Sequence, residues 1–314
     1  MLRRLTRPAV VLIVAAAVLA TCAEDDGGSP GGTIQSVEVV SQSGDYKEAV
    51  DATPSPNGET VYFTANSSTG PGVFRVAASG GTVEAVFTGG PFQRPFGIAA
   101  DTKGEHVYVS DSDAGRIFAL PLAGGEPTPV PGTDGTAPRG LEVVPEGGAD
   151  VLYFAGRDPS DGRPAVLKIA AGGGEGPTVV SKEGLSAPDA VTASRDGVVY
   201  ATDRGPAGDG RGGGVFRIRG LEVTKLAPLR PPVLAGLTLT LDESLLLVSA
   251  LSGEGTDEVL VIDLDSLRTD VFSDTIGENE SGAGLHRAHK ANVFAWADLN
   301  AGPDRQSRVY VLRA

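Results

Sequence analysis

The sequence predicts an all-β protein, a six-bladed β-propeller in which each blade has four antiparallel strands and the N-terminal strand closes the last blade. Three observations lead to this prediction. A pair of strand-like segments occurs six times at spacings of 44 to 50 residues. No helical pattern separates the copies. The 44 glycines and 22 prolines among 314 residues indicate frequent turns.

The later segment of each copy is the easier one to align, because a β-branched or apolar residue is followed by a large apolar one. This second position falls at Phe74, Phe118, Leu167, Phe216, Leu260 and Tyr310. The partner segments ahead of it are anchored by Tyr62, Tyr108, Tyr153, Tyr200, Leu247 and Phe294. Residues of these types favour half-buried strands, so each copy should supply the middle of one blade.

The two ends of the chain predict how the ring closes. The sixth copy ends at Ala314, directly after its third strand, so its blade lacks an outer strand. A spare strand-like segment, "TIQSVEVV", lies at Thr33–Val40. Placed on the outside of the last blade, it would complete four strands and cover an exposed edge. Residues 33–314 are therefore expected to form a single propeller domain.

The first residues, "MLRRLTRPAVVLIVAAAVLATC", are typical of a targeting segment with a basic start and a short apolar core. The ending "LATC" resembles the bacterial lipoprotein signal, which predicts a signal peptide at 1–21, a lipidated Cys22 and a flexible tether at 22–32. A plain secretory signal with an incidental cysteine is the alternative. Cys22 is the only cysteine, so the chain forms no internal disulfide. The expected location is the bacterial cell envelope, lipid-anchored on its periplasmic or extracytoplasmic face.

The formal net charge of −14 limits the partners. Such a surface repels nucleic-acid phosphates and anionic lipid headgroups. We therefore expect no nucleic-acid partner, contact with the membrane through the lipid anchor only, and a monomer.

The loops predict which face of the ring binds a ligand. The turns between first and second strands are tight, as at Lys103-Gly104, whereas the loops between second and third strands are long, as at Arg157–Ala165. In propeller topology the long loops share one face with the connections between blades. We call it the long-loop face and the opposite one the tight-turn face. Because variable loops carry function more often than tight turns, the long-loop face is the predicted binding face.

Candidate site residues follow from aligning the first strands, which places six residues at equivalent positions near the central channel: Asp51, Ala99, Glu142, Thr192, Thr238 and His286. The predicted ligand-binding group at this face is Arg94, Arg139, Glu142, Asp189 and His286. Asp51 and Glu142 are candidate ligands for a metal such as Ca²⁺, or an acid/base pair. The alternative is that each lines a wet channel without a chemical role.

Three other motifs give weaker evidence for a metal site or for catalysis. His286 and His289 are three residues apart, which on a strand places them on opposite faces and argues against zinc. "DSDAG" at Asp111–Gly115 suggests either calcium or an Asx-type turn. No G-x-S-x-G motif stands between a strand-like segment and a helix, as the nucleophile elbow of a serine hydrolase requires, so this chemistry has no support.

Two blades resemble known repeats. "SPNGETVYFTAN" in blade one resembles the WD40-like repeat of TolB-type propellers, and "RPFGIAADTKGEHVYVSDSDAGRIFAL" in blade two resembles NHL repeats and SMP-30/gluconolactonase-like proteins. The SMP-30 resemblance implies a divalent cation held partly by a first-blade Glu, a role that Glu48 or Asp51 would take. Their context, "KEAVDATPSP", lacks the usual Glu-Gly-Pro.

The sequence thus favours a non-enzymatic binding module for an envelope protein, a peptide or a small anionic ligand. The alternative is a Ca²⁺-dependent, SMP-30-like lactonase or hydrolase with its site at the mouth of the channel.

Overall fold

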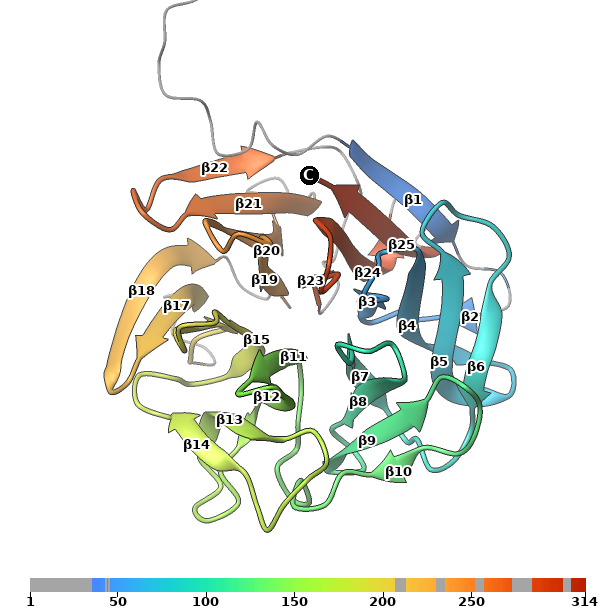
Figure 1. Ribbon diagram of the computed structural model, residues 1–314, viewed down its shortest axis with the longest axis horizontal. Coiled ribbons are helices and arrows are strands. Elements are labelled where there is room, and N and C mark those ends of the chain that lie inside the picture. The colour runs from blue at the N-terminus through green and yellow to red at the C-terminus, as the bar shows by residue number, and fades with distance from the viewer. Residues whose placement is uncertain are drawn as a thin grey trace, which may run out of the picture.

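Six β-sheets form a ring around a central channel in the computed structural model (Figure 1), which confirms the predicted six-bladed propeller. The structure describes residues 36–42, 44, 46–206, 213–229, 235–251, 257–272, 284–301 and 306–314. Over these residues, no helix has the length and apolar character needed to cross a membrane. Cys22, the tether and the predicted signal peptide lie outside the described residues.

The first three blades follow one another along the chain. Blade one consists of β2 (Tyr46–Lys47), β3 (Ala52–Pro54), β4 (Thr60–Ser67), β5 (Gly70–Ala77) and β6 (Glu84–Thr88), with β2 and β3 both paired to β4. Blade two consists of β7 (Pro95–Ala100), β8 (His106–Asp111), β9 (Arg116–Pro121) and β10 (Thr128–Pro129). Blade three consists of β11 (Leu141–Glu146), β12 (Ala149–Arg157), β13 (Pro164–Ala170) and β14 (Thr178–Ser181).

The remaining blades complete the circle. Blade four consists of β15 (Pro188–Ala193), β16 (Val199–Asp203), β17 (Gly213–Arg219) and β18 (Glu222–Leu229). Blade five consists of β19 (Leu237–Leu239), β20 (Leu245–Leu251), β21 (Asp257–Asp263) and β22 (Thr269–Phe272). Blade six consists of β23 (His286–Arg287), β24 (Val293–Ala301), β25 (Gln306–Arg313) and β1 (Ser36–Gln42).

The N-terminal strand closes the ring as the sequence predicts. β1 pairs antiparallel with β25, from Ser36 opposite Arg313 to Gln42 opposite Arg308. It is therefore the outermost strand of blade six, with its partners near the end of the chain (Figure 1). The pairing strand begins three residues later than the predicted Thr33 and continues two residues past Val40, with a bulge between Val39 and Ser41.

The pairing registers confirm the alignment of the third strands in all six blades. Phe74 lies opposite Phe63 in blade one, and the same relation repeats down to Tyr310 opposite Trp296 in blade six. The alignment of the second strands is wrong in blade six only. There Ala295, rather than Phe294, occupies the place of Tyr62, because His286 pairs with Ala295.

A hydroxyl on the second strand joins several blades to the next one. Thr64 Oγ1 donates to the carbonyl of Phe96, 2.8 Å away, and Thr202 Oγ1 donates to the carbonyl of Ala235 at 2.7 Å. Ser110 makes the same contact to blade three. These side chains satisfy carbonyls at the start of the neighbouring inner strand, so they fix how closely successive blades approach the channel.

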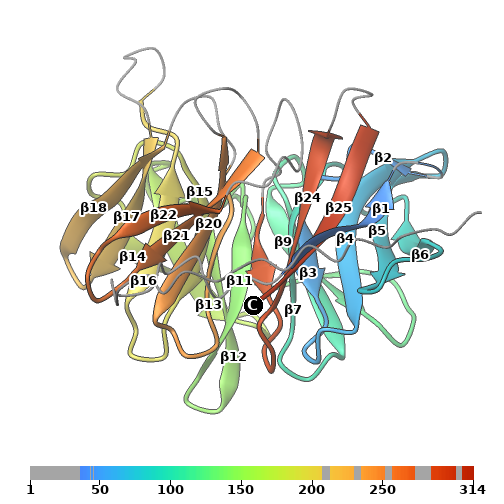
Figure 2. The same cartoon turned by 90° about the horizontal axis from the view of Figure 1, so that it is seen from above.

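Hydrophobic clusters fill the spaces between neighbouring blades. Between blades five and six, Leu247 packs with Phe294 and with a stacked pair, Trp296 and Tyr310, whose ring centroids are 5.1 Å apart. Between blades six and one, Val40 of the closing strand belongs to a buried cluster built from both blades. The ring is thus sealed by the same kind of hydrophobic packing that fills the spaces between its other blades. Figure 2 shows β1 beside β25 at the point of closure.

Deleting residues 36–42 should destabilise the ring and cause aggregation. The deletion removes Val40, which is buried, and Val37, which is partly buried against blade five and six side chains. Loss of about 3 kcal/mol of burial should lower the Tm by roughly 6–12 °C. Calorimetry and size-exclusion chromatography measure both effects, with deletion of residues 24–30 as the control. An unchanged Tm would show that β1 does not close the ring.

Candidate functional site

The inner strands approach each other closely around the channel. On each inner strand, one residue pairs with the anchor of the second strand. Two residues before it, five blades have a small residue and blade one has an acid. These positions are Asp51, Gly97, Gly140, Ala190, Gly236 and Gly284. A methyl group added at Gly140 would lie 2.5 Å from the carbonyl oxygen of Asp189, and one added at Gly284 would overlap the Asp51 carboxylate. Asp51 is thus the one large polar side chain in this narrow ring.

This register corrects one part of the sequence alignment. Thr53, not Asp51, lies opposite Tyr62, so Thr53 is the residue equivalent to Ala99 and Glu142. The error is two residues. Because side chains two apart on a strand share a face, Asp51 still points into the channel as expected.

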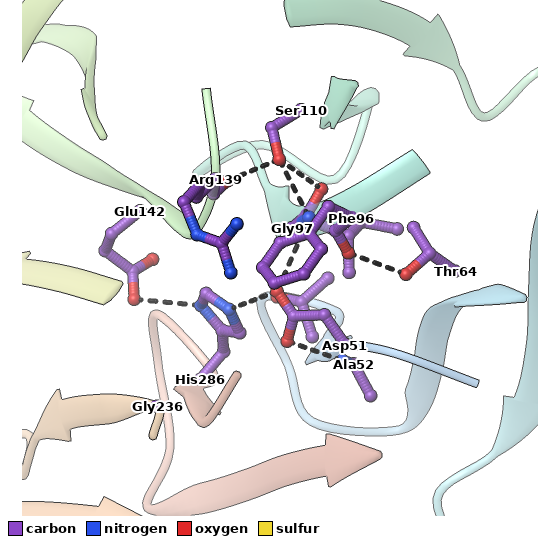
Figure 3. A network of polar contacts seen from close by, with 12 residues as sticks. Asp51, Ala52, Thr64, Phe96, Gly97, Ser110, Arg139, Glu142, Gly236 and His286 are labelled. Atoms are coloured by element: carbon purple, nitrogen blue, oxygen red, sulfur yellow. Dashed lines mark hydrogen bonds and ion pairs between the residues drawn. The ribbon is translucent and has the colours of Figure 1, made fainter. Parts of the chain in front are cut away.

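Asp51 is fully buried and held by the backbone. Its Oδ1 accepts the N–H of Ala52 at 2.7 Å, and its Oδ2 accepts the N–H of Ile98 from blade two at 2.9 Å. The same Oδ2 lies 3.1 Å from Nε2 of His286, which reaches it from blade six (Figure 3).

Glu142 of blade three binds the other side of the same imidazole. Its Oε2 lies 3.2 Å from His286 Nδ1, and its Oε1 accepts the N–H of Val143 at 3.1 Å. His286 of blade six therefore lies between two carboxylates that come from blades one and three (Figure 3). Only 4% of His286 and 8% of Glu142 remain exposed, so solvent screens these contacts weakly.

His286 carries a positive charge at neutral pH. Burial alone disfavours the charged ring, but attraction to Asp51 and Glu142 outweighs it and raises the pKa of His286 from 6.5 to about 10. Both ring nitrogens then donate, one to each carboxylate. The result is an imidazolium between two carboxylates.

A second ionic group lies toward the long-loop face. Arg139 Nε forms an ion pair with Asp189 Oδ1, and its guanidinium lies 4.5 Å from the ring centroid of Phe96. Arg204 Nε approaches the same Asp189 oxygen at 3.8 Å. Asp189 is fully buried, its Oδ2 has no hydrogen-bond partner, and burial raises the pKa of this carboxyl despite the two guanidinium groups.

The predicted ligand-binding residues thus fall into two contact groups and one separate residue. Glu142 and His286 contact each other, and Arg139 contacts Asp189. Arg94 is exposed, and its backbone N–H donates to Asp111 at 3.0 Å.

Asp111 is a turn residue, in agreement with the Asx-type turn that is one of the two interpretations of "DSDAG". Its carboxylate accepts backbone N–H groups from Gln93 at 2.7 Å and Ala114 at 2.9 Å, as well as from Arg94. The two histidines of "GLHRAHK" have separate partners, as expected. His289 Nε2 contacts the Ala100 carbonyl at 2.9 Å, whereas His286 contacts the two acids.

The residues at the channel do not fit the divalent cation that the SMP-30 resemblance implies. Ca²⁺ requires six to eight oxygen ligands with lone pairs free to coordinate. Asp51 already accepts two N–H groups and the His286 ring, and Glu142 accepts Val143 and the same ring. The protein's own imidazolium takes the place between the two carboxylates.

Sequence reasoning missed two features. Asp101, Glu105 and His106 bring metal-capable atoms within 4.8 Å of one another. Asp101 Oδ1 accepts N–H groups of Gly104 and Glu105, and Oδ2 accepts that of His106, so this acid stabilises a tight turn.

The other missed feature is a cavity of about 330 Å³. It is lined by Glu142 and by residues from the first-to-second turns of five blades: Thr102, Gly148, Arg195, Glu243 and Lys290. The cavity therefore lies at the tight-turn end of the channel, opposite to the predicted binding face.

Comparison with known proteins supports the fold. No family model and no curated protein matches the chain. Among solved structures, a putative gluconolactonase (target DrR130) superposes with a TM-score of 0.60 at 14% identity, covering 88% of this chain and 92% of that one. TolB from Acinetobacter baumannii gives 0.54 at 12% identity over 86% and 66% of the two chains. A chain of a nidogen/laminin complex gives 0.58 at 20% identity over 73% and 81%.

The chain has the six-bladed fold that TolB-type and gluconolactonase-type propellers share, as the sequence resemblance predicted. Identities this low show the fold and nothing finer.

Replacing His286 with Gln should make the free energy of unfolding change less as the pH rises into the alkaline range. In the wild-type protein, the raised pKa means that His286 stabilises the fold fully below pH 6.5 and progressively less as the pH rises to about 10. Near pH 7 the variant should lose about 3–5 kcal/mol because two buried carboxylates lose their cation.

Urea unfolding of both proteins from pH 6 to about 10 measures the difference, which should shrink as the pH rises. The half-exposed His106, replaced with Gln, is the control. A difference that stays constant over this range would mean that His286 is uncharged in the folded protein.

Proposed function

We propose that this protein is a non-enzymatic binding propeller of the bacterial cell envelope, anchored through a lipid at Cys22, whose long-loop face holds a protein segment, a peptide or a small anionic ligand. The observation that carries the proposal is the contact of His286 with Asp51 and Glu142. This contact binds both channel acids to His286, so neither carboxylate is free to react with a substrate in the channel.

The same contact disfavours the hydrolase alternative. A general base must be unprotonated near the working pH, and a histidine with a pKa of about 10 is protonated at pH 7. Asp51 and Glu142 could act on a bound substrate or cation only after releasing His286, which would leave a buried cation without partners.

The charges near the long-loop face support an anionic ligand. Arg139 and Arg204 share a single buried acid, Asp189, so this group carries one net positive charge on a strongly acidic protein. Exposed Arg94 precedes the inner strand of blade two at the same end. Guanidinium groups bind carboxylates through paired hydrogen bonds, which suits acidic peptides and small acids.

The absence of a calcium site can be tested by thermal melting. We expect the same Tm in Ca²⁺ and in EDTA, because the channel acids are already occupied. A cation bound to the native state at 100 times its Kd would add about 2.7 kcal/mol, or roughly 5–11 °C in a chain of this size. A rise of that size in Ca²⁺ that disappears in Glu142→Gln would instead support the hydrolase alternative.

Partner binding at the long-loop face can be tested by photo-crosslinking in intact cells. A crosslinking amino acid in place of exposed Arg94 should capture a specific partner, whereas one in place of exposed Thr128, on the outer strand of blade two, should not. Competition by added acidic peptide should reduce the capture at Arg94. Capture from Thr128 but not from Arg94 would place the binding surface on the side of the blades.

A further inference from the structure

The cavity on the tight-turn face is lined by acids and by cations. The acids are hydrogen-bonded, whereas two of the cations form no ion pair with any described residue. Asp150 accepts both the N–H and the hydroxyl of Thr102, at 3.1 and 2.8 Å. Glu243 accepts the N–H of Arg195 at 3.1 Å and lies 3.4 Å from its guanidinium. The third acid, Glu142, is bound to His286 as described above. Each acid that lines the cavity is therefore hydrogen-bonded, and Glu142 and Glu243 also have a cationic partner, whereas the partner of Asp150 is neutral.

Arg287 differs from these acids. Its Nε donates to the carbonyl of Leu239 at 2.7 Å and its Nη1 to the carbonyl of Ala288 at 2.6 Å. Both partners are neutral, and among the described residues no acid lies within ion-pair distance of this guanidinium. The side chain is only partly exposed, and burial lowers the pKa of Arg287. The two carbonyls fix the orientation of the guanidinium, and Arg287 lines the cavity.

Lys290 supplies a second cation at the rim. Its backbone N–H donates to the Pro56 carbonyl at 2.9 Å, which fixes the turn, while the side chain is exposed. In the described part of the chain no carboxylate pairs with its ammonium. Arg287 and Lys290 both line the cavity, so two positive charges face one space without acidic partners.

Val144, Pro145 and Leu239 also line the cavity and form its apolar wall. An inorganic anion would use the cations and gain nothing from this wall. A volume of about 330 Å³ lies at the small end of ligand pockets, so it suits one small molecule rather than a polypeptide chain.

We propose that this cavity binds a small organic carboxylate, with its carboxylate on Arg287 and Lys290 and its hydrocarbon part against Val144, Pro145 and Leu239. This proposal rests on the proposed binding function and adds a second site, on the face opposite to the long loops. The ligand lies toward the rim, because the negative Glu142 forms the inner end of the cavity.

The test uses the full chain and ligand-observed NMR with a set of small aliphatic and aromatic carboxylates, the primary amides of the same acids, and inorganic phosphate. We expect several carboxylates to bind, and the amides and phosphate not to bind. For the tightest carboxylate, titration calorimetry should show about 10- to 100-fold weaker binding to Arg287→Gln, because a hydrogen bond to a charged group is lost.

Two further variants separate binding from folding. Lys290→Gln changes an exposed side chain, so it should fold normally and bind at least several-fold more weakly. Arg219→Gln removes an exposed arginine on the outer part of blade four and should bind as the wild-type protein does. The Tm of each variant shows whether it is folded.

Three results would overturn the proposal: no carboxylate of the set binds, amides or phosphate bind as well as the acids, or Arg287→Gln and Lys290→Gln both keep full affinity. These outcomes leave the proposed function standing if the probe at Arg94 captures a partner. Carboxylate binding that depends on Arg287 without capture at Arg94 would support this site and count against the long-loop face.

Discussion

An imidazolium held between two buried carboxylates is the interaction on which the centre of this propeller depends. Asp51, Glu142 and His286 come from blades one, three and six, so their contacts tie together three separate sheets. Each of the three charges would be costly if buried alone. The ring must therefore close with all three in place, and Gly284 gives Asp51 the space it needs.

The repeat could be read from the sequence because it rests on local patterns. β-branched and aromatic residues mark the third strands, and their spacing gave the correct register in every blade. The alignment failed where the pattern is ambiguous. In blade six Phe294 and Trp296 are both aromatic and flank the true position, Ala295, so the sequence pattern points to an aromatic residue one place too early. In blade one an acid stands where four other blades have glycine, which hid the equivalence of Asp51 with Gly97.

The candidate site was predictable only in part, for a physical reason. Strand periodicity places Asp51, Glu142 and His286 on the channel side, but it contains no information on distances across a ring between residues up to 235 positions apart. Whether the imidazole lies between the acids or beside them depends on how closely the blades approach. The cavity on the tight-turn face was missed for a related reason. Its lining comes from the turns of five blades, and Arg287 and Lys290 look like ordinary surface residues in their own segment.

The central ion group also separates the two ends of the channel. His286 and Glu142 are almost fully buried where the inner strands approach most closely, and Glu142 forms the inner end of the tight-turn cavity. A negative charge added at one end favours the protonated form of His286, because it attracts the imidazolium over several ångströms in a poorly screened interior. Because His286 is already protonated at neutral pH, such a charge would raise its pKa further and leave its charge unchanged, so the central ion group stays intact whichever face is occupied.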